Sequence, residues 1–340
     1  MQQQVTTVGL DLAKNLFQVH GADAQGRPVL RRRLAREKVR EFFANLPPCL
    51  VGLEACAAAH YWARELAKLG HTVRLMPPQY VRPYVKTNKH DAADAEAICE
   101  AVTRPGMRFV PVKDEGQQSV LMLQRVREQL LKQRTATINA LRGHLAEFGI
   151  VAARRQIGLR ELLTVVADVE DHRLPPLARE LLESLVAHLR DLERRTAELD
   201  RRLVKASRDG AACERLTAVP GVGPVIATAL VAAVGNAKSF SSGRHLAAWL
   251  GLVPRQRSSG GKERLLGLSK RGDGYLRRQL MHGARALVRI SQGREGRLWS
   301  WINGLLGRRA FNVVVAAVAS KLARILWALL SRGETYRAAA

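Results

Sequence analysis

Acidic side chains and cysteines are both scarce in this 340-residue chain. Thirty Asp and Glu face 55 Lys and Arg, which gives a formal net charge of +25. Such an excess argues against an ordinary metabolic enzyme and for a polyanionic partner. The chain is nonetheless 47% apolar, so it can bury a core and is not a disordered basic tail. Its length suggests two or more domains.

The four cysteines form no C-x-x-C pair, which argues against a zinc module and a disulfide framework. The polar segment 1–7 lacks the layout of a signal peptide. The apolar stretch 217–235 is broken by Pro and Gly, and 313–330 carries Lys321 and Arg324, so neither predicts a membrane span. We therefore expect a cytoplasmic, nucleoid-associated protein with no membrane partner.

The positive charge is concentrated at one end of the chain. Residues 206–340 carry 22 basic and 6 acidic side chains, a net charge of +16, whereas 1–110 and 111–205 carry +6 and +3. A solvated helix face is the ordinary fate of charge runs, but such faces usually mix signs. Contact with nucleic acid is therefore favoured for this segment. The basic residues expected to bind nucleic acid are Arg255, Arg257, Lys262, Arg264, Lys270, Arg271, Arg277 and Arg278.

The first hundred residues alternate strand and helix signals. Apolar runs punctuated by Gly and Pro predict the elements in chain order. They are strands 6–12, 16–20 and 28–34, helix 36–46, strand 49–54, helix 58–69 and strand 72–76. This succession, with a final helix, is the order of a ribonuclease H-like domain, which we place at 1–112.

The rest of the chain is predominantly helical. Apolar residues at helical spacing predict two long amphipathic helices, 119–148 and 174–202, with a short helix in the link 149–171. They predict a coiled-coil-like arm over 113–205, and its role as dimerisation element or spacer stays open.

The remaining segment, 206–340, is expected to be a helical domain. Its stretch 216–226 has the Gly-rich turn of a helix-hairpin-helix element, although a tight helix-helix turn needs the same residues. We expect a helix at 243–250, an irregular stretch at 251–274 and three helical segments over 275–332. The fold class is thus α/β plus all-α.

Four carboxylates stand out in the first domain. Asp11 interrupts an apolar strand, Glu54 ends another, and Asp91 and Asp94 lie three residues apart, which puts both on one helix face. Acids in apolar strands require a cation or donors nearby. Because the first and fourth strands neighbour each other in a ribonuclease H-like sheet, the four are expected to converge on Mg²⁺ or Mn²⁺. Alternatively, Asp91 and Asp94 are ordinary first-turn helix acids, and His90 either tunes the site or is simply exposed.

Two hydroxyls occur in a Gly-rich, cation-dense loop, Ser258 and Ser259. Such a loop can approach a phosphate closely and stabilise the charge that develops when it is attacked. From composition alone, a solvated loop or a non-covalent phosphate clamp is favoured over a nucleophile.

The motifs together resemble the DEDD transposases of bacterial insertion sequences, the family that includes the invertase Piv. In the N-terminal part the resemblance is carried by Gly52-Leu-Glu-Ala-Cys56, Val73-Arg-Leu-Met-Pro-Pro and Asn88-Lys-His-Asp-Ala-Ala-Asp94. In the C-terminal part it is carried by Val219-Pro-Gly-Val-Gly-Pro and Pro254-Arg-Gln-Arg-Ser-Ser-Gly-Gly-Lys262.

The resemblance implies a RuvC-like domain whose Asp11, Glu54, Asp91 and Asp94 bind Mg²⁺. It implies that Ser259, rather than Ser258, forms a phosphoserine link to DNA. It further implies donor and target DNA, a non-coding guide RNA, and a homo-oligomer, dimer or tetramer, whose sites combine domains of different protomers. Two other hypotheses remain: a RuvC-type nuclease that uses metal-activated water, with the serine loop only binding phosphate, and a non-catalytic nucleic-acid-binding protein.

Overall fold

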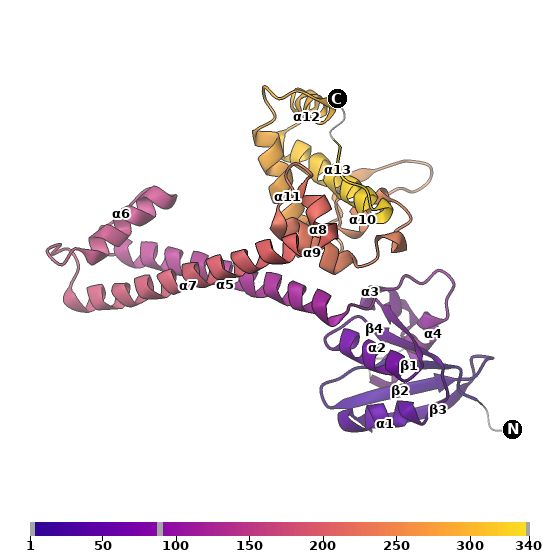
Figure 1. Cartoon of the computed structure of the whole chain (residues 1–340). Coiled ribbons are helices and arrows are strands. Elements are labelled where there is room, and N and C mark those ends of the chain that lie inside the picture. The colour runs from indigo at the N-terminus through magenta and orange to yellow at the C-terminus, as the bar shows by residue number, and fades with distance from the viewer. Residues whose placement is uncertain (1–3, 87–90, 338–340) are drawn as a thin grey trace. The chain divides into compact units, whose positions relative to one another are not determined.

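The computed structural model describes residues 4–86 and 91–337. It divides into two compact units, Met1–Gly116 and Gln117–Ala340 (Figure 1). All strands but two belong to the first unit, and the second is built mainly of helices.

Five strands form the sheet of the first unit, in the order β3-β2-β1-β4-β5. They are β1 (Thr7–Asp11), β2 (Leu16–Ala22), β3 (Pro28–Ala35), β4 (Leu50–Glu54) and β5 (Thr72–Met76). The first three strands pair antiparallel, whereas β1 with β4 and β4 with β5 pair parallel. The predicted strands are therefore present, and the mixed sheet is consistent with a ribonuclease H-like domain.

Helices cover both faces of this sheet. The helices of the unit are η1 (Arg36–Lys38), α1 (Val39–Ala44), α2 (Ala59–Lys68), α3 (Pro78–Val81), η2 (Arg82–Tyr84) and α4 (Asp91–Val102). On one face, Phe43 of α1 and Trp62 of α2 pack in a core with Val8, Leu10 and Phe17. On the other face, Ile98 and Val102 of α4 form a second cluster with Met76.

Two glycines bring α4 unusually close to the sheet. A Cβ on Gly9 would lie 2.1 Å from the carbonyl oxygen of Ala95 and 2.4 Å from the amide nitrogen of Cys99. A Cβ on Gly52 would lie 2.8 Å from Cβ of Val102. The α4 backbone thus occupies space that any side chain on Gly9 would need.

The same four-residue pattern ends both central strands. Val8-Gly-Leu-Asp11 on β1 and Val51-Gly-Leu-Glu54 on β4 lie side by side in register, with Gly9 opposite Gly52. Because side chains alternate along a strand, the glycine and the acid of each pattern face the same side of the sheet. The acids therefore face α4, while Val and Leu face the other core.

The second unit begins with two long helices, α5 (Glu115–Ala146) and α7 (Pro176–Arg208), linked through α6 (Gln156–Ala167) (Figure 1). Arg127 pairs with Asp200 and Arg134 with Glu193, so α5 and α7 run antiparallel. Leucines of both helices join α6 in one core at the far end, which includes Leu141 and Leu189. These positions fit the predicted pair of long helices, although heptad packing is not demonstrated.

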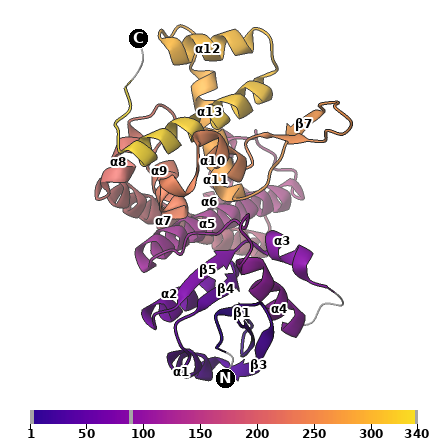
Figure 2. The same cartoon turned by 90° about the vertical axis from the view of Figure 1, so that its right-hand side faces the viewer.

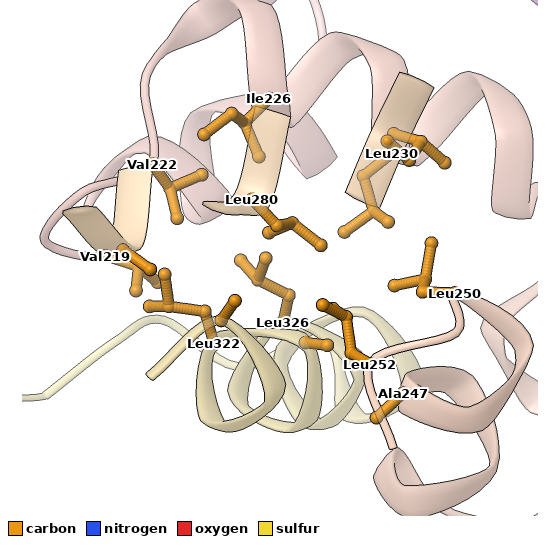
Figure 3. Close-up of a cluster of buried hydrophobic side chains, with 14 of the residues drawn as sticks. Val219, Val222, Ile226, Leu230, Ala247, Leu250, Leu252, Leu280, Leu322 and Leu326 are labelled. Carbon is orange, nitrogen blue, oxygen red and sulfur yellow. The ribbon is translucent and has the colours of Figure 1, made fainter. Parts of the chain in front are cut away.

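Short helices complete this unit around one apolar core. They are α8 (Ala211–Thr217), α9 (Pro224–Val234), η3 (Ala237–Ser239), α10 (Gly243–Trp249), α11 (Gly274–Arg289), α12 (Arg297–Leu306) and α13 (Phe311–Arg332). Figure 3 shows Leu280 of α11 between Ile226 and Leu230 of α9 and Leu322 and Leu326 of α13. Among the described residues, α13 alone is long and apolar enough to cross a membrane. One side of it is buried in this core, which identifies a core helix.

The stretch 251–274, expected to be irregular, contains a β-hairpin. Strands β6 (Pro254–Gln256) and β7 (Leu265–Leu268) pair antiparallel. At the tip, Gly260 and Gly261 both have positive φ, +57° and +75°, as a two-residue hairpin turn requires. The prediction was wrong because charged and glycine residues hide the strand pattern, while the Gly-Gly turn is the signal that could have revealed it. Figure 2 shows the hairpin extending from the helices of its own unit.

The close approach of α4 predicts a sharp cost for a side chain at Gly9. Gly9→Ala should destabilise the protein by about 3 kcal/mol, because the helix backbone must move to admit the methyl group. Gly106→Ala is the control, since a Cβ there meets nothing within 4 Å, and it should change stability by less than about 0.5 kcal/mol. Urea unfolding of both variants measures this, and equal midpoints would contradict it.

Candidate metal centre and serine loop

Three of the four predicted carboxylates come together where α4 begins. Asp11, the last residue of β1, and Asp91 and Asp94, in the first turn of α4, have carboxylate oxygens that all lie within 4.8 Å of one another. Asp11 and Asp94 are half-buried and Asp91 is exposed. Hard oxygen donors so arranged fit a divalent cation such as Mg²⁺ or Mn²⁺. His90 lies outside the described residues.

Glu54 lies next to this group without belonging to it. The parallel ladder ends at the pair Leu10 and Leu53, so Asp11 and Glu54 follow on neighbouring strands, about 4.8 Å apart, facing α4. The first turn of α4 lies over β1, one strand away from Glu54. Burial raises the pKa of the Cys56 thiol, and the negative charges of Glu54 and Asp11 raise it further, which places both carboxylates near that sulfur.

Ser258 and Ser259 have different surroundings in the β6–β7 hairpin. The Ser258 hydroxyl accepts hydrogen bonds from the amide of Arg264 at 3.3 Å and from Nε2 of Gln256 at 3.0 Å. Ser259 is the first residue of the turn, where its carbonyl accepts from the amide of Lys262 at 3.1 Å. Its hydroxyl has no recorded hydrogen bond within 4–86 and 91–337, and the residue is exposed.

The base of the hairpin is anchored to the helices of its unit. A Cβ on Gly272 would lie 1.8 Å from the carbonyl oxygen of Trp249, so the two chain segments touch at backbone level. The Arg277 guanidinium donates to the carbonyls of Leu250 at 3.0 Å and Arg271 at 2.9 Å. The base of the hairpin is therefore fixed, whereas a Cβ added to Gly260 or Gly261 at the tip would meet nothing within 4 Å.

The eight basic residues predicted to bind nucleic acid divide into two groups. Arg277 holds the hairpin base, and Arg278 pairs with Glu128 and lies over the Tyr275 ring, so both have partners inside the unit. The other six are exposed on or beside the hairpin. These six are Arg255, Arg257, Lys262, Arg264, Lys270 and Arg271.

The Gly-rich turn between α8 and α9 packs against α11. A Cβ on Gly221, which has φ of +77°, would lie 2.8 Å from Cγ of Leu287, and one on Gly283 would lie 2.1 Å from the Gly221 carbonyl oxygen. The turn glycines thus serve close helix packing, the structural alternative that the sequence left open. Phosphate binding by this turn stays a prediction.

Sequence reasoning overlooked the glycines that position the acids. The repeated Val-Gly-Leu-acid pattern was visible at 8–11 and 51–54. Two strands that end in the same pattern, each with a glycine two residues before an acid, indicate a helix that lies closely over both strands.

One chain contains both a carboxylate cluster on a mixed sheet and an exposed serine in a basic hairpin. These groups are suited to an enzyme that acts on nucleic-acid phosphodiesters. Comparison with known proteins is more specific. A model of DEDD transposases of IS110 elements matches residues 8–150, and one described as "Transposase IS116/IS110/IS902 family" matches 213–298.

Full-length relatives agree with these matches. A probable family 20 transposase of Pseudomonas aeruginosa is 54% identical, over 98% of this chain and 99% of its own length. The transposase for insertion sequence element IS1328 of Yersinia enterocolitica is 43% identical, over 98% of each chain. The chain belongs to the IS110 family of insertion-sequence transposases and is a DNA transposase. The hypothesis of a non-catalytic nucleic-acid-binding protein is thereby excluded.

The carboxylate geometry predicts the ligand dependence of metal binding. Asp11→Asn and Asp94→Asn should each weaken Mn²⁺ binding more than about tenfold, because each removes a charged oxygen donor from the group. Glu54→Gln should weaken it less. Glu100→Gln, on the same helix but paired with Arg104, is the control and should bind as the parent does. Titration calorimetry measures the affinities, and indistinguishable values for the Asp11 and Glu100 variants would refute the assignment.

Proposed function

We propose that this transposase cuts and rejoins DNA strands with Ser259 as nucleophile, at a phosphate positioned by a divalent metal bound to the carboxylates. The observation that carries the proposal is the difference between the two serines. Ser258 is held in the hairpin by two hydrogen bonds, whereas Ser259 is exposed at its tip and its hydroxyl forms none within the part of the chain that the structure describes.

The carboxylate group supports the metal part of the proposal. Asp11, Asp91 and Asp94 would hold the ion, with Glu54 within reach from the next strand. Mg²⁺ or Mn²⁺ bound there would supply a positive charge that orients the phosphate and offsets its negative charge. The Gly9 and Gly52 contacts hold α4, and hence Asp91 and Asp94, at the required depth.

In the chemical step, Oγ of Ser259 attacks the scissile phosphorus. A new Oγ–P bond forms, and the P–O bond to the leaving deoxyribose oxygen breaks. The hydroxyl proton of the serine passes to solvent, and the leaving oxygen takes up a proton from solvent. Attack by that oxygen, or by the end of another strand, on the phosphoserine reverses the step and rejoins DNA. The covalent link conserves the energy of the phosphodiester bond, so that rejoining needs no nucleoside triphosphate.

The exposed cations around the tip fit this role. Arg255, Arg257, Lys262 and Arg264 lie on the hairpin itself and are exposed. They would clamp the backbone on both sides of the scissile phosphate and stabilise the charge on its oxygens during attack. Lys270 and Arg271 extend the same basic surface to the base of the hairpin.

We further propose, from the family resemblance, that a non-coding RNA of the element guides the enzyme to donor and target DNA. A homo-oligomer, dimer or tetramer, would bring serine and carboxylates of different protomers to one phosphate. The net charge of +25 agrees with binding to polyanions, DNA and RNA alike. Acting on DNA, the enzyme would work at the nucleoid.

The second candidate is a RuvC-type nuclease, in which metal-activated water attacks and the serine loop only binds phosphate. The carboxylate group favours it as much as it favours the serine mechanism. The two differ in one product, since only serine attack leaves protein covalently attached to DNA.

Ser259→Ala should abolish strand exchange and the covalent protein–DNA adduct, because it removes the attacking oxygen, while DNA affinity changes by less than about twofold. Ser258→Ala, the matched control one residue away, should retain the adduct. Asp11→Ala should lose strand exchange as well. Denaturing gel electrophoresis of labelled DNA detects the adduct. Full recombination by the Ser259 variant would refute the nucleophile, and cleavage without any adduct would favour the water mechanism.

The guide-RNA proposal predicts that one defined RNA co-purifies with the full chain. Sequencing the bound nucleic acid should return a transcript from the element that carries segments complementary to donor and target. A mixture of cellular RNA in proportion to abundance would count against guidance.

A further inference from the structure

A second feature of the first unit is a polar hollow beside the carboxylates, on the α4 side of the sheet. It has a volume of about 350 Å³ and lies between α4 and the β2–β3 pair. This is within the size range of pockets that hold small ligands. Its walls include Gln18 and His20 of β2, Arg31 of β3, Ala92 of α4 and Lys86.

The strand register joins this hollow to the metal centre. Asp11 lies opposite Gln18, and His20 lies opposite both Gly9 and Arg31. Opposed residues share a face, so these side chains follow one another on the α4 side. Gln18 is therefore the direct neighbour of Asp11, and the hollow continues from the carboxylates toward the edge strand β3.

The residues of α4 leave this space open. The helix face that borders the hollow carries Ala92, Ala93 and Ala95, and only Glu96 is long. Glu96 pairs with both cations of the wall, with Lys86 Nζ 3.0 Å from its Oε1 and Arg31 at 3.9 Å, and Lys86 also lies 3.8 Å from Glu100. No described side chain of α4 fills the hollow, so a group from outside can enter it.

The chemistry of the walls selects an anion with an aromatic group attached. Arg31 and Lys86 outnumber Glu96, and the Arg31 and Lys86 side chains are 70% and 67% exposed. Burial lowers the pKa of His20, whose neutral ring can form hydrogen bonds without adding charge. Tyr84 lies at the wall with the Arg104 guanidinium over its ring, 5.8 Å from the centroid, so a base would stack on the other face of the ring. A second hollow shares His20, Lys86 and Glu96 but adds Asp23 and Glu100, so the basic character ends there.

We propose that this hollow, the β2–α4 pocket, binds the nucleotide next to the one at the carboxylates, with Arg31 and Lys86 on its phosphate and Tyr84 on its base. The inference rests on the proposed function only in placing a strand at Asp11. The pocket explains why β2 and β3 present polar and basic side chains to a face that α4 would otherwise bury. The strand is DNA or RNA, since both carry the same phosphodiester chemistry.

The test uses the full chain and two double variants matched in charge and exposure. Arg31→Gln with Lys86→Gln alters the pocket. Lys38→Gln with Arg40→Gln alters the opposite side of the sheet, at η1 and α1, where Lys38 Nζ lies 3.0 Å from Glu41 and Arg40 lies 3.7 Å from Glu65. Side chains of Lys38 and Arg40 are 65% and 66% exposed, close to those of the pocket pair.

Fluorescence anisotropy with a labelled single-stranded DNA, and with RNA of the same sequence, gives affinity against salt. Removing both cations from this one phosphate should reduce the salt slope by about 0.7, and the control pair should change it by less than half as much. Equal changes in both variants would overturn the proposal. The strand with the larger change identifies DNA or RNA as the occupant.

Ultraviolet cross-linking with peptide mass spectrometry provides a second, localised measurement. A nucleotide adduct is expected on the peptide of Tyr84 and not on that of Tyr61, an exposed tyrosine of α2 on the other face. The pocket double variant should lose this adduct and the control should keep it. Adducts on both tyrosines, or on Tyr61 alone, would overturn the proposal. Neither measurement needs cleavage, so the Ser259→Ala protein gives the same result even where the serine mechanism fails.

Discussion

The carboxylate group of this transposase depends on how closely α4 approaches β1 and β4. Gly9 and Gly52 lack the atoms that would hold the helix away, and α4 fills that space with its own backbone. The first turn of α4 then lies over the end of β1, so Asp91 and Asp94 reach Asp11. Without that contact the acids would remain on separate elements with no reason to be near one another.

The two compact units carry charges of opposite sign at their candidate phosphate-binding sites. The first unit has a group of carboxylates, whose negative charge would repel a phosphate unless a cation were bound between them. The net charge of this unit is modest. The second presents positive charge directly, on an exposed hairpin beside a tightly packed helical core. The net charge of +16 in the last third of the chain therefore belongs to the unit that carries the hairpin, and the positive charge is not spread evenly over the molecule.

Element order was predictable from sequence because Gly and Pro punctuate apolar runs of clear period, and β5 matches its expected range. The acids were recognisable because Asp11 and Glu54 stand at the ends of apolar strands. The depth of α4 was not predictable, since it depends on contacts between residues some 85 positions apart in sequence. The different bonding of Ser258 and Ser259 was hidden too, because it follows from the register of a hairpin whose strands are charged.

The length of the hairpin sets the position of the serine. Its base is fixed against α10 and α11 and its tip carries the serine, so the number of residues in each strand sets how far the hydroxyl reaches. A strand advances about 3.3 Å per residue, and a change of one residue turns every following side chain to the opposite face. Reach can therefore change only in paired steps of about 7 Å, and a related enzyme that needs a different reach must add or remove two residues from both strands together.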